Sequence, residues 1–267
     1  MTPLEIAELV LVGLVAGVLG GLLGIGGSIV MIPALGLILG LNQHLAQASA
    51  MIVNVFVAIP ALLRHRRAGA VRWDVFWRML PLALLFILIG VETSNQFDGR
   101  LLRRVFGVFL LYVIAVNIHR LISRAAEPPV HEQRPGWATS GPVGAIMGFA
   151  AGLLGIGGGG IAVPLLQRIC NLPLRQCIAT STAVMCITAG IGAARKNLSL
   201  GALTAADGTL LGLSADQSLL IAACLAPTAL VGGLFGAHLT HALPLKWIRL
   251  AFILLMAWAS ANMLLGR

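Results

Sequence analysis

Charged side chains are scarce in this sequence, since Asp, Glu, Lys and Arg together make up only 10% of its 267 residues. A typical soluble domain has about 25%. The stretches 79–91, 105–116 and 219–236 contain no charged residue. With their apolar flanks, each reaches the ~20 residues that cross a hydrocarbon core. Together with a hydrophobic fraction of 58%, this scarcity excludes a soluble globular domain and predicts an integral membrane protein.

Motifs of metal, redox and enzymatic chemistry are also lacking. The four cysteines form no CxxC pair and lie in or beside apolar segments, so we interpret them as small buried hydrophobic residues. The sequence has no phosphate-binding loop and no His-Glu-x-x-His, and its glycine runs lack the βαβ context of a dinucleotide site. We therefore expect no enzyme activity, no cofactor and no metal.

Basic residues exceed acidic ones and give a formal net charge of +9. They fall between apolar spans rather than on one soluble face, so we expect no nucleic-acid partner and interpret them as determinants of membrane orientation. With eight crossings, eleven Lys and Arg residues fall on the side of the N-terminus and seven on the other. The positive-inside rule then predicts cytoplasmic N- and C-termini.

An internal repeat organises the chain. The segment Leu22–Gly27 (LLGIGG) recurs 131 residues later as Leu153–Gly158, and the offset holds without a gap from 13–64 to 144–195, with 17 of 52 positions identical. The predicted units are a first transmembrane repeat over 1–122, a polar, proline-broken linker over 123–138 and a second transmembrane repeat over 139–267.

The repeats predict an all-α membrane protein of about eight transmembrane helices. Four crossings per repeat would make the two repeats parallel, related by an axis along the membrane normal. The first helix of each repeat is broken at its glycine-rich motif, and if these motifs are re-entrant loops the crossings must be recounted. The expected crossings are 4–41 with a break at 24–28, 44–63, 76–93 and 101–121, then 142–169, 174–194, 218–239 and 245–265.

The glycine-rich breaks are candidates for an anion-binding site. Unwound backbone inside a bilayer is tolerated only where it is buried in protein or lines a wet cavity. The helix that resumes after each break presents free N–H groups and a positive dipole end. A purely structural crossing of helices is the alternative. The candidate residues of the two breaks are Gly24, Gly26, Gly27, Ser28, Gly155, Gly157, Gly158 and Gly159.

Small polar residues on the following helices are expected near the same region. Ser49, Asn54, Thr180, Ser181 and Thr182 could bind an oxyanion without a fixed charge, or could hydrogen-bond between helices instead. Arg64 and Arg195 occupy equivalent positions at helix ends. Both are either anchors at the membrane surface or part of an anion gate. Glu92 is interpreted as interfacial, with proton coupling as the alternative.

The paired motifs resemble those of the sulfite-exporter (TauE/SafE) family, also called the 4-toluene sulfonate uptake permease family. The resemblance rests on the two LLGIGG segments, each followed by an apolar run and Pro33 or Pro164, and on the turn 64–71. It implies a bacterial inner-membrane permease for small sulfur-containing anions. The repeats depart from symmetry, since Ser28 stands opposite Gly159 and Asn54 opposite Met185. The two half-sites are therefore not chemically equal.

These observations lead to one functional hypothesis, a secondary transporter for small anions in the cytoplasmic membrane. Export of sulfite or an organosulfonate through a site between the two broken helices is favoured. An anion channel and a non-transporting membrane sensor or partner protein are the alternatives. The expected partners are the anion and the lipid bilayer, and a homo-oligomer is left open. Replacing Gly26 or Gly157 with Leu is expected to abolish transport and to leave folding largely intact.

Overall fold

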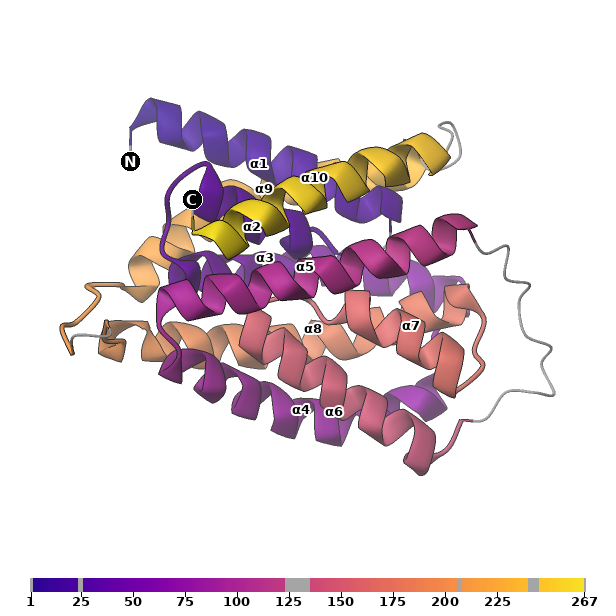
Figure 1. Cartoon of the computed structure of the whole chain (residues 1–267). Coiled ribbons are helices and arrows are strands. Elements are labelled where there is room, and N and C mark those ends of the chain that lie inside the picture. The colour runs from indigo at the N-terminus through magenta and orange to yellow at the C-terminus, as the bar shows by residue number, and fades with distance from the viewer. Residues whose placement is uncertain (1, 24–25, 123–134, 206–207, 240–244, 267) are drawn as a thin grey trace.

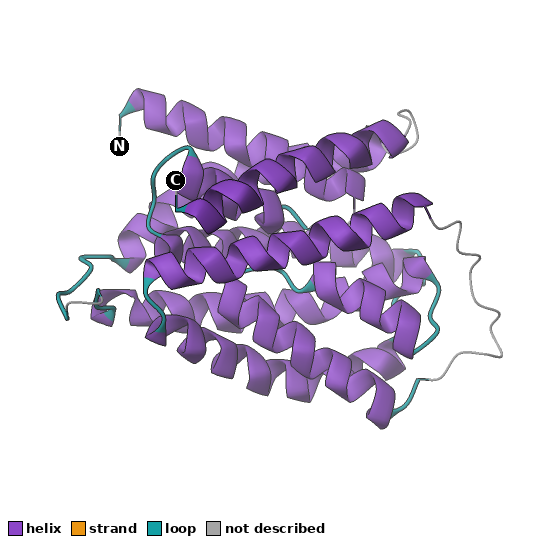
Figure 2. Cartoon of the chain, viewed as in Figure 1, coloured by secondary structure: helices purple, strands orange, loops and turns teal. Residues whose placement is uncertain are grey.

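Helices joined by short loops make up the described chain (Figures 1 and 2). The computed structural model describes residues 2–23, 26–122, 135–205, 208–239 and 245–266. Seven of the described helices are long and apolar enough to cross a membrane, and α10 has 21 residues. The predicted all-helical membrane fold is confirmed. The helices are α1 (Pro3–Leu23), α2 (Ser28–Leu37), α3 (Gln43–Arg67), α4 (Trp73–Gln96), α5 (Gly99–Ile122), α6 (Trp137–Leu154), α7 (Gly159–Ile169), α8 (Leu174–Ser199), α9 (Ala215–Leu239) and α10 (Leu245–Leu265).

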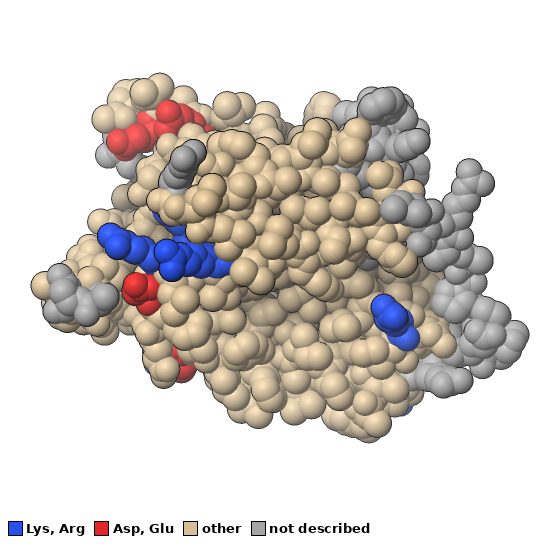
Figure 3. All heavy atoms as spheres, in the orientation of Figure 1, with Lys and Arg blue, Asp and Glu red and all other residues tan. Residues whose placement is uncertain are grey.

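The outer surface of the helix bundle is apolar. Large hydrophobic side chains such as Leu11, Trp77, Val108 and Phe235 are more than half exposed. Figure 3 shows charged side chains near the two ends of the bundle with a broad uncharged band between them. Exposed apolar surface of this extent is unfavourable in water and marks contact with lipid. The band therefore fits a membrane-spanning bundle.

Glycine-lined helix contacts join the two repeats. Gly17 of α1 lies against the backbone of Ala229 in α9, and its repeat equivalent Gly148 of α6 lies against the backbone of Ala83 in α4. A side chain at either glycine would meet a backbone carbonyl, so only glycine permits this approach. The first helix of each repeat thus packs along a helix of the other repeat, and the two repeats interlock rather than form separate bodies.

Each glycine-rich break reverses the direction of the chain. Cys170, which follows α7, lies 3.7 Å from Ser140 near the start of α6, measured between Sγ and Oγ. Gly36 near the end of α2 accepts a hydrogen bond at 3.3 Å from Arg103 near the start of α5. Helices α1 and α2, and likewise α6 and α7, therefore form re-entrant hairpins. Of the two alternatives that the sequence left open, broken span or re-entrant loop, the structure shows the second.

The re-entrant hairpins invert one repeat relative to the other. His44 near the start of α3 contacts the carbonyl of Phe97 after α4 and the ammonium of Lys196 near the end of α8. At the other end of the bundle, the backbone N–H of Arg72 donates to Thr180 near the start of α8. Helices α3 and α8 are equivalent in the repeat and run in opposite directions. The predicted parallel relation is wrong, because each hairpin returns to its own side and leaves three net crossings per repeat.

Two sides of the bundle can now be named. The termini side holds the start of α1, the start of α3 and the ends of α4, α8 and α10. The Arg64 side holds the end of α3 and the starts of α4, α6 and α8 (Figure 1). Among the described residues, counted by position in the helices and their adjoining loops, the Arg64 side has ten Lys and Arg residues and the termini side has five. The ten are Arg64, Arg66, Arg67, Arg72, Arg78, Arg120, Arg168, Arg175, Lys246 and Arg249, and the five are Arg100, Arg103, Arg104, Arg195 and Lys196.

Residues 123–134 of the predicted linker lie outside the described residues, and the boundaries at 122 and 138 remain predictions. The described chain has α5 ending at Ile122 and α6 beginning at Trp137.

Candidate functional site

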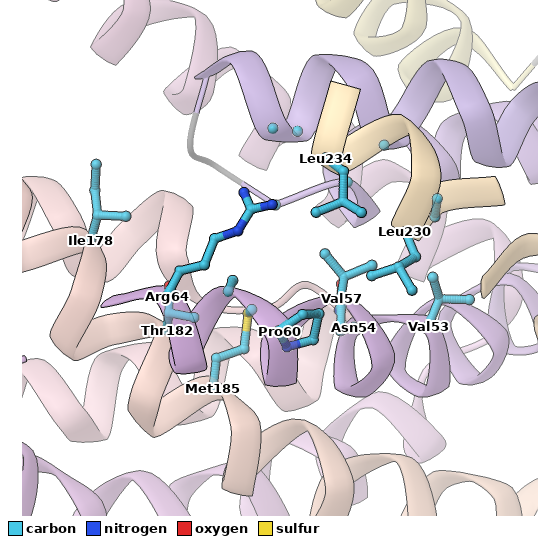
Figure 4. Close-up of a pocket in the computed structure, with 18 of the residues that line it drawn as sticks. Val53, Asn54, Val57, Pro60, Arg64, Ile178, Thr182, Met185, Leu230 and Leu234 are labelled. Atoms are coloured by element: carbon cyan, nitrogen blue, oxygen red, sulfur yellow. The ribbon is translucent and has the colours of Figure 1, made fainter. Parts of the chain in front are cut away.

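A cavity of about 470 Å³ lies beside the first glycine-rich break. Its walls come from α1, α3, α8 and α9, and Gly26 and Gly27 of the break contribute to its inner end. Figure 4 shows side chains of α3, α8 and α9 converging on this space. The volume lies within the ~300–1,000 Å³ typical of small-molecule sites.

One face of α3 forms a wall of the cavity. Val53, Val57, Pro60 and Arg64 line it, together with neighbouring residues on the same face. Their spacing of three to four residues places them along one stripe of a helix. From Val53 to Arg64 the helix rises about 16 Å, so the cavity reaches from the break toward the Arg64 side.

The polar groups of the cavity favour an anion. Arg64 extends its guanidinium into the cavity from α3 (Figure 4), and Asn54, His65 and Thr182 also line it. Gly27 is the N-cap of α2, and no side chain caps this helix end. The first amides of a helix have no partner within the helix, and they carry the positive end of its dipole. The described lining residues include no carboxylate, so no acidic side chain in this lining offsets the charge of Arg64.

Backbone geometry explains why glycine is needed at the inner end. Gly26 has φ = +84°, and a Cβ added there would meet no other atom within 4 Å. Space is therefore available at this position, while the left-handed backbone is unfavourable for any residue with a Cβ. The open space beside Gly26 lets a ligand approach the main chain directly.

The second break, in contrast, is filled by side chains. Gln47 of α3 donates to the carbonyl of Leu153 at 3.2 Å, and Asn54 donates to the carbonyl of Gly155 at 3.5 Å. Their repeat equivalents on α8 are Ile178 and Met185, whose side chains cannot donate in this way. The amides of α3 thus close the second break, while apolar side chains of α8 line the cavity at the first one. This difference in residue type accounts for the cavity at the first break.

The two breaks touch each other at the centre of the bundle. The hydroxyl of Ser28 accepts a hydrogen bond of 3.3 Å from the backbone N–H of Gly157, and Ser28 is fully buried. Ser28 is also where the first repeat departs from the second, which has Gly159 there. The two breaks therefore meet, and Ser28 faces the other break and not the cavity.

The structure brings only some of the predicted site residues to the cavity. Those that line it are Gly26, Gly27, Asn54, Thr182 and Arg64. Gly24 lies outside the described residues. The remaining predicted residues lie away from the cavity lining: Ser28, Gly155, Gly157, Gly158, Gly159, Ser49, Thr180, Ser181 and Arg195.

Three of the predicted hydroxyls make structural hydrogen bonds. Ser49 donates to the carbonyl of Leu45 one turn earlier at 2.9 Å, and Ser181 donates to its own helix at 3.1 Å. Thr180 accepts from the backbone N–H of Arg72 at 3.1 Å and so fixes the loop before α4. For Thr180 this is the bonding between elements that the sequence left open as an alternative.

Arg64 and Arg195 lie on opposite sides of the bundle, because the repeats are inverted. Arg64 lines the open cavity. Arg195 forms an ion pair with Glu92 near the end of α4, and both side chains are a little under half exposed. The two arginines therefore cannot act together at a single mouth.

Sequence reasoning misses several residues of functional interest. His65 and Met185 line the cavity, and Lys196 is fully buried on the termini side. In the sequence, Lys196 counts only as a loop charge. The repeat offset provides a signal for it, since Lys196 is the equivalent of His65 just as Arg195 is the equivalent of Arg64.

Inverted repeats, discontinuous first helices and a cavity at the break are features that many membrane transporters share. Residues 9–263 match the model of the family described as "Sulfite exporter TauE/SafE". The chain belongs to this family.

Curated relatives support the transporter class. The chain is 25% identical to the "Probable membrane transporter protein MamO" of Paramagnetospirillum magneticum over 97% of its own length and 44% of that protein. It is 24% identical to the "Probable membrane transporter protein YunE" of Bacillus subtilis over 90% of both chains, and 32% identical to a "Probable membrane transporter protein" of Xylella fastidiosa over 64% of both. The chain thus spans less than half the length of the MamO protein. No solved structure matches it.

Proposed function

We propose that this chain is a secondary transporter for a small anion and that the cavity beside the first break is its binding site. The observation that supports this most directly is the meeting of the uncapped α2 N-terminus, at Gly27, with the Arg64 guanidinium in one cavity. The guanidinium is a cation, and the N-terminus of α2 carries the positive end of the helix dipole. The described lining residues of the cavity include no carboxylate that would offset either one. A helix N-terminus with a nearby arginine is well suited to an oxyanion.

Sulfite or an organosulfonate is the substrate class that we favour. The family description names sulfite, and a sulfur oxyanion presents several acceptor oxygens to the donors of the cavity. Asn54, Thr182 and Arg64 supply amide, hydroxyl and guanidinium donors. The apolar walls formed by Val57, Leu230 and Leu234 would suit the carbon skeleton of a sulfonate.

We propose that the Arg64 side faces the cytoplasm of a bacterial cell. In the described part of the chain, the Arg64 side has ten Lys and Arg residues and the termini side has five, and cytoplasmic loops carry the excess of Lys and Arg. This reverses the orientation predicted from the sequence, because the inverted repeats move Arg195 and Lys196 to the opposite side from Arg64. Both termini would then lie outside the cytoplasm. A cavity that opens toward the cytoplasm is ready to load an anion for export.

Closure on the termini side favours a transporter over an anion channel. The side chains of Lys196 and Gln43 are buried there, and Arg195 pairs with Glu92. A conducting channel needs a continuous path, whereas a carrier is open to one side at a time.

Ligand-dependent thermal stability of the purified protein tests this function. The panel would be sulfite, thiosulfate, sulfoacetate, taurine, sulfate, acetate and chloride at fixed ionic strength. A ligand that binds only the folded state raises Tm as its concentration exceeds Kd. We expect a selective rise with sulfite or a sulfonate, followed by saturable counterflow of that anion in proteoliposomes.

Two results would contradict the proposal. Equal Tm with every anion would remove the anion site and leave the sensor or partner hypothesis. Selective binding with a flux that never saturates and shows no counterflow would favour the channel instead.

A further inference from the structure

A buried lysine on the termini side takes no part in the open cavity. Lys196 has no exposed surface, and its ammonium lies 3.0 Å from Nδ1 of His44, 2.6 Å from Oγ of Ser94 and 2.9 Å from Oδ1 of Asn95. None of the ion pairs among the described residues includes Lys196. Glu92 interacts with this ammonium electrostatically without pairing directly with it. A buried ammonium that lacks a direct ion pair is costly, and inside a membrane protein such a group is a candidate for a functional role.

The repeat assigns Lys196 a counterpart in the open cavity. The offset of 131 pairs Lys196 with His65 and Arg195 with Arg64, and both His65 and Arg64 line that cavity. Because the repeats are inverted, Lys196 and Arg195 stand at the equivalent place on the opposite side. They are where the mouth of a second, symmetry-related cavity would be.

A second buried polar group at this place has no partner. Gln43 is 1% exposed, and neither Oε1 nor Nε2 of its carboxamide has a hydrogen-bond partner. The same offset pairs Gln43 with Leu174, which lines the open cavity. Buried amides are nearly always hydrogen-bonded. An unpartnered one suggests a conformation in which it meets a ligand or water.

Specific contacts keep this second cavity closed. Arg195 pairs with Glu92 at the surface, and Ser94 links the Lys196 ammonium to Oε1 of Gln47 through hydrogen bonds of 2.6 Å and 3.2 Å. Deeper in the bundle, Met51 and Ile87 crowd Gly192, which is the equivalent of the cavity residue Ala61. The closing contacts thus lie between α8 and its neighbours α3 and α4.

We propose that a second anion site, formed by Lys196, Gln43 and Arg195, opens on the termini side when the Arg64 cavity closes. This inference rests on the proposed transport function and adds the opposite mouth and its main anion-binding group. Lys196 would exchange its neutral partners His44, Ser94 and Asn95 for the anion. The structure is then the state open to the Arg64 side.

Thiol accessibility tests the second cavity without any transport assay. Val57 lines the open cavity, and its equivalent Thr188 is 1% exposed. V57C and T188C would each be made in a background with its four native cysteines replaced by alanine, in nanodiscs that expose both faces to a charged thiol reagent. We expect V57C to react at least tenfold faster than T188C. Adding E92Q, which removes the Arg195 ion pair, should speed T188C severalfold and slow V57C.

Failure of this coupling would overturn the proposal. If T188C stays unreactive with E92Q and with saturating sulfite, and the V57C rate does not change, no second cavity opens. Sulfite that protects V57C and exposes T188C would support it directly.

The role of Lys196 has its own test in oriented proteoliposomes. K196M should raise the KM for sulfite supplied on the termini side about tenfold or more and change the KM on the Arg64 side little. R104M, which removes an exposed positive charge on the same side at a residue outside the proposed site, is the matched control and should leave both values within about twofold. The Tm and size-exclusion profile of each variant check folding.

The outcomes separate the two proposals. Equal KM values on both sides in K196M, with normal transport otherwise, would reject the Lys196 site and keep the transport function. The absence of binding and flux for every anion of the panel in the unmodified protein would reject the transport function, while the thiol rates would still report whether a second cavity exists.

Discussion

Ser28 and Gly157 join the two repeats at the centre of the bundle through a hydrogen bond of 3.3 Å from the Gly157 amide to the Ser28 hydroxyl. The bond joins the unwound segment before α7 to the first residue of α2, and both residues are buried. It satisfies a backbone donor that the re-entrant geometry removes from any helix. The serine that breaks the symmetry of the repeat is therefore a structural requirement of the opposite break.

Replacing Ser28 with alanine should destabilise this crossing. The buried Gly157 N–H would lose its acceptor, and we expect the free energy of unfolding to fall by about 1 kcal/mol. Reversible unfolding in mixed micelles would measure it. S181A is the control, because Ser181 donates only to its own helix. An equal loss in both variants would show that the Ser28 bond has no special role.

Leucine at Gly26 and at Gly157 should have different consequences. Gly26 has open space around it, so G26L should fold with a backbone strain of about 1–2 kcal/mol and lose transport as the side chain occupies the cavity. A side chain at Gly157 would collide with the sulfur of Met185, so G157L should also lose folded protein. Yield, monodispersity and counterflow would distinguish the two. Normal transport in G26L would remove the first break from the substrate path.

Arg64 is the main charged donor of the open cavity. Loss of a hydrogen bond to a charged group costs about 1.5–3 kcal/mol, so R64Q should weaken anion binding roughly 10- to 100-fold. R66Q is the matched control, since Arg66 is exposed two residues further along α3 and does not line the cavity. Calorimetric titration with the anion selected from the panel would measure both. Similar losses in R64Q and R66Q would indicate general surface attraction and no specific site.

The orientation has a simple test in intact cells. Thr2 and Ala68 are both exposed, and they lie on opposite sides of the bundle because Thr2 precedes α1 and Ala68 follows α3. In the cysteine-replaced background, a thiol reagent that crosses the outer but not the inner membrane should label T2C and spare A68C. The reverse pattern would place the termini in the cytoplasm, in agreement with the charge count over eight crossings, and would make the open cavity face outward.

The sequence predicted the helices better than their arrangement. The apolar runs and the LLGIGG repeat located every crossing, and α10 has the expected bounds of 245–265. The parallel relation failed because both a broken span and a re-entrant hairpin satisfy the same glycine motif. Only contacts across the bundle, such as Ser140 with Cys170, separate the two.

The candidate site was predictable in part for a similar reason. A helix shows from its sequence which residues share a face, so Asn54 and Arg64 could be proposed together, and both line the cavity. Which repeat keeps an open cavity depends on whether α3 or α8 supplies amides to the facing break. Gln47 and Asn54 do so for the second break. The sequence contains these two amides, but it does not show toward which break their side chains point.

The interlocked packing of α1 on α9 sets an order of assembly during synthesis. Helix α1 ends at residue 23 and α9 ends at residue 239, so the ribosome adds more than 200 residues before the partner of α1 is complete. At ~5–20 residues per second, α1 waits in the bilayer for roughly 10–45 s with its glycine face toward lipid. Helix α6, in contrast, meets a finished α4 as soon as it enters the membrane. The second repeat therefore packs its first helix, α6, on a helix that is already in the membrane. The first helix of the first repeat, α1, gains its partner only near the end of synthesis.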